Sequence, residues 1–95
     1  MYKELNHLLL SHLRLTVMAH LAVAGEAEFN VLKEQAGATS GNLSVQITKL
    51  QEAGYIGVVK SSRNNYSLTT CQITPQGREA LKLFYSDLMS YLGGV

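Results

Sequence analysis

A very short connection between two predicted helices in the middle of the chain is the feature that most limits how it can fold. The first helix is predicted at 30–36, with Asn30 as its cap. Gly37 ends it, because glycine readily adopts the left-handed conformation that follows helices. Only two residues separate Gly37 from Ser40, where a second helix begins. The sequence therefore predicts a helix-turn-helix motif.

The second helix of this motif, at about 40–53, has one apolar face and one small polar face. Leu43, Ile47 and Leu50 recur at spacings of four and three residues, which places them on one side of a helix. The other side and its flanks carry Gly41, Asn42, Ser44, Val45, Thr48 and Lys49. A plain solvated helix face usually carries more glutamate and lysine. This composition therefore favours contact with another molecule.

Apolar patterns predict further helices on both sides of the motif. Leucines at helical spacing predict a terminal helix at about 1–10, and Ser11 is the predicted cap of the helix that follows it. A last helix is predicted at about 75–92, where Thr74 is the cap and Pro75 takes the first helical position.

A β-hairpin is predicted between the motif and the last helix. Residues 55–60 and 66–73 are rich in the residue types that favour strands, and the asparagines between them favour a turn. The alternation of the second strand changes parity, which predicts a bulge near Thr69 and Thr70. The expected fold is mainly α with a small β-hairpin (α+β), in a single domain over 1–95.

Three stretches carry a family resemblance. They are LRLTVMAHLAVAGEAEF, VLKEQAGATSGNLSVQITKLQEAGYI and ITPQGREAL. Their order and spacing resemble those of winged helix-turn-helix transcriptional regulators of the MarR and ArsR groups, especially short members with little beyond the DNA-binding domain. The resemblance covers residues from about 8 to 85. It implies a homodimeric, sequence-specific DNA-binding regulator, with the helix at 40–53 in the major groove and a wing at 61–67 at the backbone or minor groove.

The side chains of the helix at 40–53 suit a DNA groove. Amides and hydroxyls bond base edges, and valine can touch a thymine methyl group. The predicted base-reading residues are Ser40, Asn42, Ser44, Val45 and Thr48. Cationic side chains and helix N-termini bind phosphates. The predicted phosphate-binding residues are Arg14, Thr39, Lys49, Lys60 and Arg63.

Charge supports this surface modestly. The formal net charge is +1, which argues against coating nucleic acid through bulk charge. The cations at 36–66 are Lys49, Lys60 and Arg63, against Glu52 alone. Arg14 lies outside this segment, and two roles stay open for it: a phosphate contact, as in many relatives, or an ion pair at the surface or dimer interface.

The terminal helices carry more large apolar side chains than one small core needs. Exposed apolar patches often mark interfaces. The predicted dimer interface is Leu5, Leu9, Phe84, Tyr85, Leu88, Tyr91 and Leu92. Pairing across a two-fold axis would let two subunits reach two half-sites about one turn of DNA apart. The alternative is that both helices pack on their own domain.

Other chemistries are poorly supported. His7, His12 and His20 are not spaced to place two metal ligands on one helix face, so no metal and no cofactor are expected. The single cysteine, Cys71, lies in an apolar strand pattern, which favours burial over a redox role. No catalytic motif or local acid–base pair appears, so an enzyme is not expected.

The partner and the location are also predicted. A winged-helix module that binds protein through Val45 and Tyr66 is the alternative to DNA binding. Polar residues interrupt the apolar N-terminal region, and no apolar run approaches the ~20 residues of a membrane span. We therefore expect a cytoplasmic protein with double-stranded DNA and a second copy of itself as partners. The sequence does not identify the operator or an effector.

Overall fold

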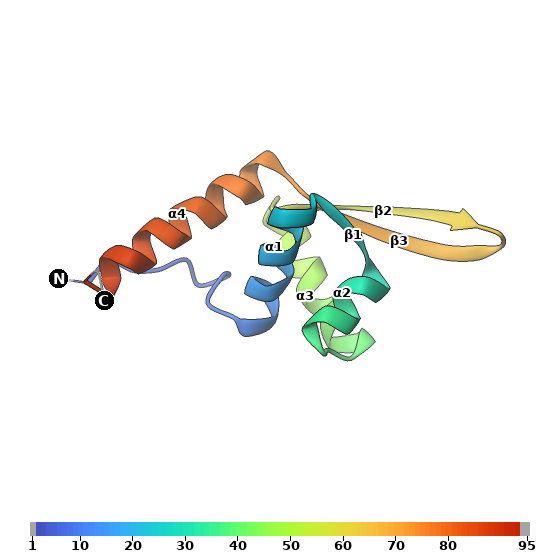
Figure 1. Ribbon diagram of the computed structural model, residues 1–95, viewed down its shortest axis with the longest axis horizontal. Helices are drawn as coiled ribbons and strands as arrows, with labels where there is room; N and C mark the ends of the chain where they lie inside the picture. The colour runs from blue at the N-terminus through green and yellow to red at the C-terminus, as the bar shows by residue number, and fades with distance from the viewer. Residues whose placement is uncertain (1, 94–95) are drawn as a thin grey trace.

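The computed structural model describes residues 2–93. The elements are α1 (His12–Ala24), β1 (Glu26–Glu28), α2 (Phe29–Ala36), α3 (Ser40–Glu52), β2 (Ile56–Arg63), β3 (Tyr66–Ile73) and α4 (Pro75–Tyr91). The first three helices lie together at the centre, and the β2–β3 hairpin and α4 extend from them toward opposite ends of the molecule (Figure 1). This is the winged-helix α+β arrangement that the sequence predicted.

Three helices begin at the hydroxyl caps expected from the sequence. The side-chain oxygens of Ser11, Thr39 and Thr74 each accept a hydrogen bond from the backbone N–H three residues later, at 3.2, 3.2 and 2.9 Å. α2 differs from its prediction. It begins at Phe29, directly after β1, so Asn30 lies inside the helix instead of capping it.

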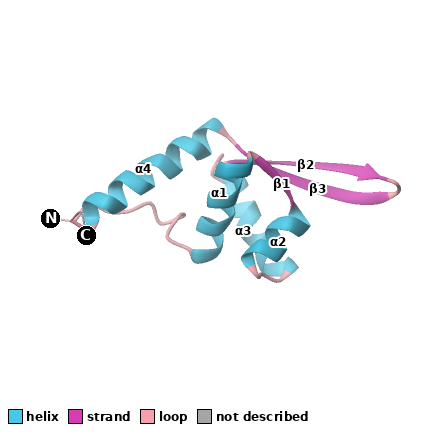
Figure 2. Ribbon diagram, in the orientation of Figure 1, coloured by secondary structure: helices cyan, strands magenta, loops and turns pink. Residues whose placement is uncertain are grey.

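The sheet has three antiparallel strands in the order β1-β3-β2. β2 and β3 pair without interruption from Ile56 opposite Ile73 to Arg63 opposite Tyr66, so the predicted bulge is wrong. The change in alternation has another cause. The outer half of the hairpin projects beyond the helices, where neither face of the ribbon has a core to cover (Figure 2). β1, which pairs with β3, is too short to give a sequence pattern.

The N-terminal segment is not the helix that the sequence predicted. Residues 2–10 form an irregular strap with one turn at 7–9. The Asn6 side chain accepts a hydrogen bond from the backbone N–H of Leu8 at 3.0 Å and donates one to the Tyr55 hydroxyl at 2.9 Å. Such local bonds compete with helix formation. Leu5 and Leu9 lie in the hydrophobic core of the chain, which holds the strap in place.

α4 leaves the body at a close approach between two backbones. A Cβ on Gly77 would lie 2.1 Å from the carbonyl oxygen of Tyr55, so only glycine fits there. Beyond this point Phe84 packs into the core, and the C-terminal half of α4 runs beside the N-terminal strap, with Lys3 Nζ 3.2 Å from Asp87 Oδ1 (Figure 1). Within residues 2–93, no helix has the length and hydropathy needed to cross a membrane.

Candidate DNA interface

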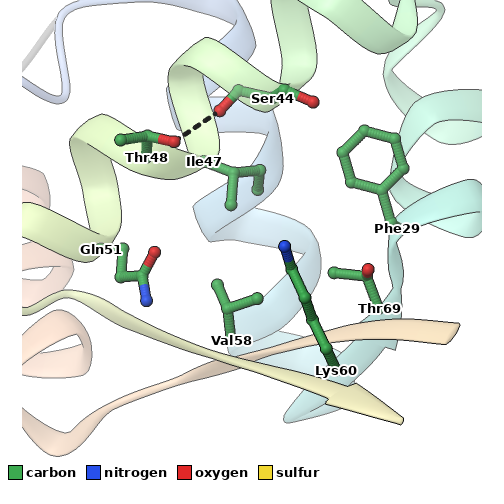
Figure 3. Close-up of a pocket in the computed structure, with 8 residues that line it drawn as sticks. All are labelled: Phe29, Ser44, Ile47, Thr48, Gln51, Val58, Lys60 and Thr69. Atoms are coloured by element: carbon green, nitrogen blue, oxygen red, sulfur yellow. Dashed lines mark hydrogen bonds between the residues drawn. The ribbon is translucent and has the colours of Figure 1, made fainter. Parts of the chain in front are cut away.

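α3 buries its apolar stripe and exposes its small polar side chains. Leu43, Ile47 and Leu50 belong to the core. All five predicted base-reading residues are exposed: Ser40, Asn42, Ser44, Val45 and Thr48. The Thr48 hydroxyl donates to the Ser44 carbonyl at 3.0 Å, so its oxygen is left to accept hydrogen bonds (Figure 3). The helix therefore offers a mixed surface of donors, acceptors and one branched apolar side chain.

A cleft of about 280 Å³ separates α3 from the hairpin. It is lined by Phe29, Ser44, Ile47, Thr48, Gln51, Val58, Lys60 and Thr69. Figure 3 shows Lys60 reaching from β2 toward α3, with Phe29 and Thr69 to one side of it. The cleft thus places the cation of Lys60 between α3 and the hairpin, the two elements predicted to contact DNA. The hydroxyl side chains of Ser44 and Thr48 line the same cleft.

The remaining predicted phosphate-binding residues have different surroundings. Lys49 is exposed on α3. Thr39 uses its side-chain oxygen to cap α3, beside the free N–H groups of the first turn. Arg63, near the tip of the hairpin, has its Nη2 3.9 Å from Glu28 Oε1, a loose and exposed pair that contributes little stability.

Arg14 is bound within its own chain. Its Nε donates to the Leu8 carbonyl at 2.6 Å, and its Nη1 donates to Gln46 Oε1. Gln46 Nε2 in turn donates to Asn42 Oδ1 at 3.1 Å. Sequence reasoning did not find this network. The four-residue spacing of Asn42 and Gln46 was visible, but the contact of Arg14 with α3 depends on the tertiary fold.

The predicted dimer residues fall into two groups. Leu5, Leu9 and Phe84 are buried in the core of the chain itself, so we correct their assignment as partner contacts. An apolar pattern alone does not distinguish a helix that faces its own core from one that faces a partner. Leu88 packs against the edge of the core.

An apolar surface does remain at the end of the molecule that holds both termini. We define the terminal apolar surface as Tyr2, Tyr85, Met89, Tyr91 and Leu92, which are all exposed. The rings of Tyr2 and Tyr91 lie 4.8 Å apart, and Tyr85, Met89 and Leu92 recur at spacings of four and three along α4 and its C-cap. Tyr2 and Met89 were not predicted, although Met89 follows the helical period.

The residues considered for metal or redox chemistry lie elsewhere. Among residues 2–93, no group of three or more His, Cys, Asp or Glu side chains gathers in a metal-binding arrangement. Cys71 is fully buried in β3, and burial raises the pKa of its thiol, because the thiolate would lose its hydration.

Known proteins are similar to this chain in sequence and in fold. Residues 13–92 match the winged helix DNA-binding domain family. An uncharacterized protein of Methanocaldococcus jannaschii is 34% identical over 79 residues, which cover 83% of this chain and 86% of that protein. A transcriptional regulator homologue from Pyrococcus horikoshii superposes with a TM-score of 0.86 at 29% identity, over 94% of this chain and 88% of that one.

The same fold occurs inside a larger regulator. A MarR-family transcriptional regulator from Silicibacter pomeroyi superposes with a TM-score of 0.68 at 20% identity, over 90% of this chain but 56% of the other. The chain belongs to the winged helix DNA-binding domain family, and its fold is that of MarR-like transcriptional regulators.

Proposed function

We propose that this protein is a cytoplasmic, sequence-specific transcriptional regulator that binds double-stranded DNA as a homodimer. α3 of each subunit would lie in the major groove, and the hairpin tip at 61–67 would lie at the backbone or minor groove. The observation that carries this proposal is the exposed face of α3. It combines short hydrogen-bonding side chains with Val45 and Lys49, which suits base edges and phosphates together.

Two further features support the placement of DNA. The N-terminal end of α3 is exposed, and the partial positive charge of its free N–H groups favours the binding of a phosphate. Lys60 lies in the cleft between α3 and the hairpin, where a phosphate between the two contact regions would pass. With so few cations, one subunit is expected to bind DNA weakly.

A dimer would compensate for this weakness by doubling the contacts. The terminal apolar surface is the natural place for a second copy, because large exposed apolar patches commonly mark interfaces. It lies at the opposite end of the long axis from the hairpin tip (Figure 1). Two subunits joined there would keep both copies of α3 and both wings free for DNA.

The test is selection of bound sites from random duplex DNA at two salt concentrations. We expect a palindromic consensus, with binding that weakens steeply as salt rises because phosphate contacts release counterions. Recovery of no enriched sequence at either concentration would contradict the proposal. A non-palindromic consensus would leave DNA binding intact and contradict the dimer.

Protein binding through the same face is the second candidate. It is favoured by the exposure of Val45 and Tyr66, whose side chains would otherwise leave apolar surface in water, and by the small charge of the wing. Salt distinguishes the two candidates, because an apolar contact between proteins does not weaken steeply as salt rises.

A further inference from the structure

We propose that Arg14, acting through Gln46, determines which hydrogen-bonding group Asn42 presents to a base. The inference rests on the proposed DNA binding by α3 and adds a positioning role to it. Three side chains form a line from α1 to the face of α3: Arg14 Nη1 donates to Gln46 Oε1, and Gln46 Nε2 donates to Asn42 Oδ1 at 3.1 Å.

The direction of this line is fixed by chemistry. A guanidinium has donors and no acceptor, so Gln46 must turn its oxygen toward Arg14. The amide nitrogen of Gln46 then faces Asn42 and can only donate, so the side-chain oxygen of Asn42 must accept this hydrogen bond. The outward group of Asn42 is therefore its Nδ2, a donor. Without Arg14, no other member of this line would fix which way the two amides are oriented.

The start of the line is held firmly. Arg14 is partly buried, and its Nε donates to the carbonyl of Leu8 at 2.6 Å. The adjacent Leu9 is fully buried in the core, and Asn6 bonds the Tyr55 hydroxyl at 2.9 Å, so the strap that carries this carbonyl is anchored at two points. A fixed donor at the core thus sets the polarity of an exposed side chain on α3.

This polarity predicts a base preference. In the major groove guanine and thymine present only acceptors, whereas cytosine presents only a donor. Asn42 lies in the first turn of α3, the part of a recognition helix that contacts base edges. With Nδ2 outward, Asn42 should favour guanine or thymine over cytosine at one position of each half-site. A factor of about five or more in affinity is expected from one such contact.

The experiment compares site selection by the wild-type protein and three variants. In Gln46→Glu, the carboxylate still accepts from Arg14 but can no longer donate, so Asn42 should turn its Nδ2 inward and its oxygen outward. The preference at that position should move to cytosine or adenine. Gln46→Met keeps the length of the side chain but removes the relay, so the preference should flatten. Gln35→Glu, at an exposed position of α2, is the control for added charge and should keep the wild-type preference.

The outcomes separate this inference from the proposed function. A reversed preference in Gln46→Glu, or a flattened one in Gln46→Met, supports the relay. Wild-type preference at every position in both variants overturns the relay while leaving DNA binding intact. Wild-type protein that enriches no sequence overturns the proposed function and the relay with it. If added charge abolishes binding by Gln46→Glu and Gln35→Glu alike, the neutral Gln46→Met decides. Circular dichroism melts confirm that each variant is folded.

Discussion

At the scale of single residues, Lys49 and Asn42 have different tasks in the proposed interface. An exposed lysine on α3 contributes charge that any DNA sequence can use, so Lys49→Ala should weaken binding to all sequences alike. The slope of log affinity against log salt should fall by about one unit. Titrations at several salt concentrations measure it. Lys82→Ala, at an exposed position of α4, is the control. An unchanged slope in Lys49→Ala would remove Lys49 from the contact surface.

Asn42 instead contributes a directional contact. Asn42→Ala should cost about 1–3 kcal/mol on the selected site and relax the preference at one position. The cap of α3 survives this change, because Thr39 bonds the backbone N–H of residue 42 and not its side chain. Affinities for the selected site and for random duplex DNA measure the effect. Equal losses on both would contradict base reading.

Cys71 predicts a pH dependence of stability. Burial raises the pKa of its thiol in the folded protein above the ordinary value, so the unfolded chain releases the proton at a lower pH. The free energy of unfolding should therefore fall as pH rises past the ordinary thiol pKa, by at most about 1.4 kcal/mol per pH unit. Urea unfolding from pH 7 to 10 measures this slope. Cys71→Ala should lack this part of it, and identical slopes would contradict the argument.

At the scale of elements, the sequence predicts most of what is local. Ser11, Thr39 and Thr74 cap helices as expected, and Asn64 and Asn65 adopt the positive φ of the hairpin turn. The failures involve contacts between distant segments. The helix expected at 1–10 is replaced by a strap, whose shape depends on the hydrogen bond between Asn6 and Tyr55. The predicted bulge is absent, because the outer part of the hairpin lies beyond the core and its side chains need not alternate between apolar and polar.

In the candidate interface, too, the local features could be predicted from the sequence and the contacts between distant residues could not. The exposed face of α3 follows from helical periodicity, so its five base-reading candidates could be placed on the surface without a structure. The role of Arg14 could not, because its bond to Gln46 joins residues that are 32 positions apart. The sequence left open a phosphate contact or an ion pair for Arg14, and the structure adds hydrogen bonds to the Leu8 carbonyl and to Gln46.

The junction between the sheet and α4 gives an element-scale prediction. In Gly77→Ala the new methyl group would collide with the Tyr55 carbonyl, which must move together with the start of α4. We expect a loss of about 1–3 kcal/mol or more, measured by urea unfolding. Gly41→Ala is the matched control. Nothing lies within 4 Å of its new Cβ, and alanine favours helices, so it should stabilise the fold by up to about 1 kcal/mol. Equal effects of the two changes would contradict the close approach.

At the scale of the whole molecule, the β2–β3 hairpin and α4 extend in opposite directions from the three central helices (Figure 1), and this arrangement suggests how two copies would assemble on DNA. The chain measures 54 × 25 × 21 Å, with the hairpin tip at one end of the long axis and the termini at the other (Figure 1). A subunit of this shape can devote one end to a partner and the other to DNA.

The dimer prediction places a charge within that surface. Tyr85 is 67% exposed, so Tyr85→Glu should leave the fold of the subunit intact. If two copies meet there, the buried carboxylate would lack a partner, which strongly disfavours association. Light scattering should show a dimer for the wild type and a monomer for Tyr85→Glu, with affinity lost for paired half-sites. Val31→Glu, an exposed apolar position on α2, should remain dimeric. A dimeric Tyr85→Glu would place the interface elsewhere, whereas a monomeric wild type would contradict the dimer itself.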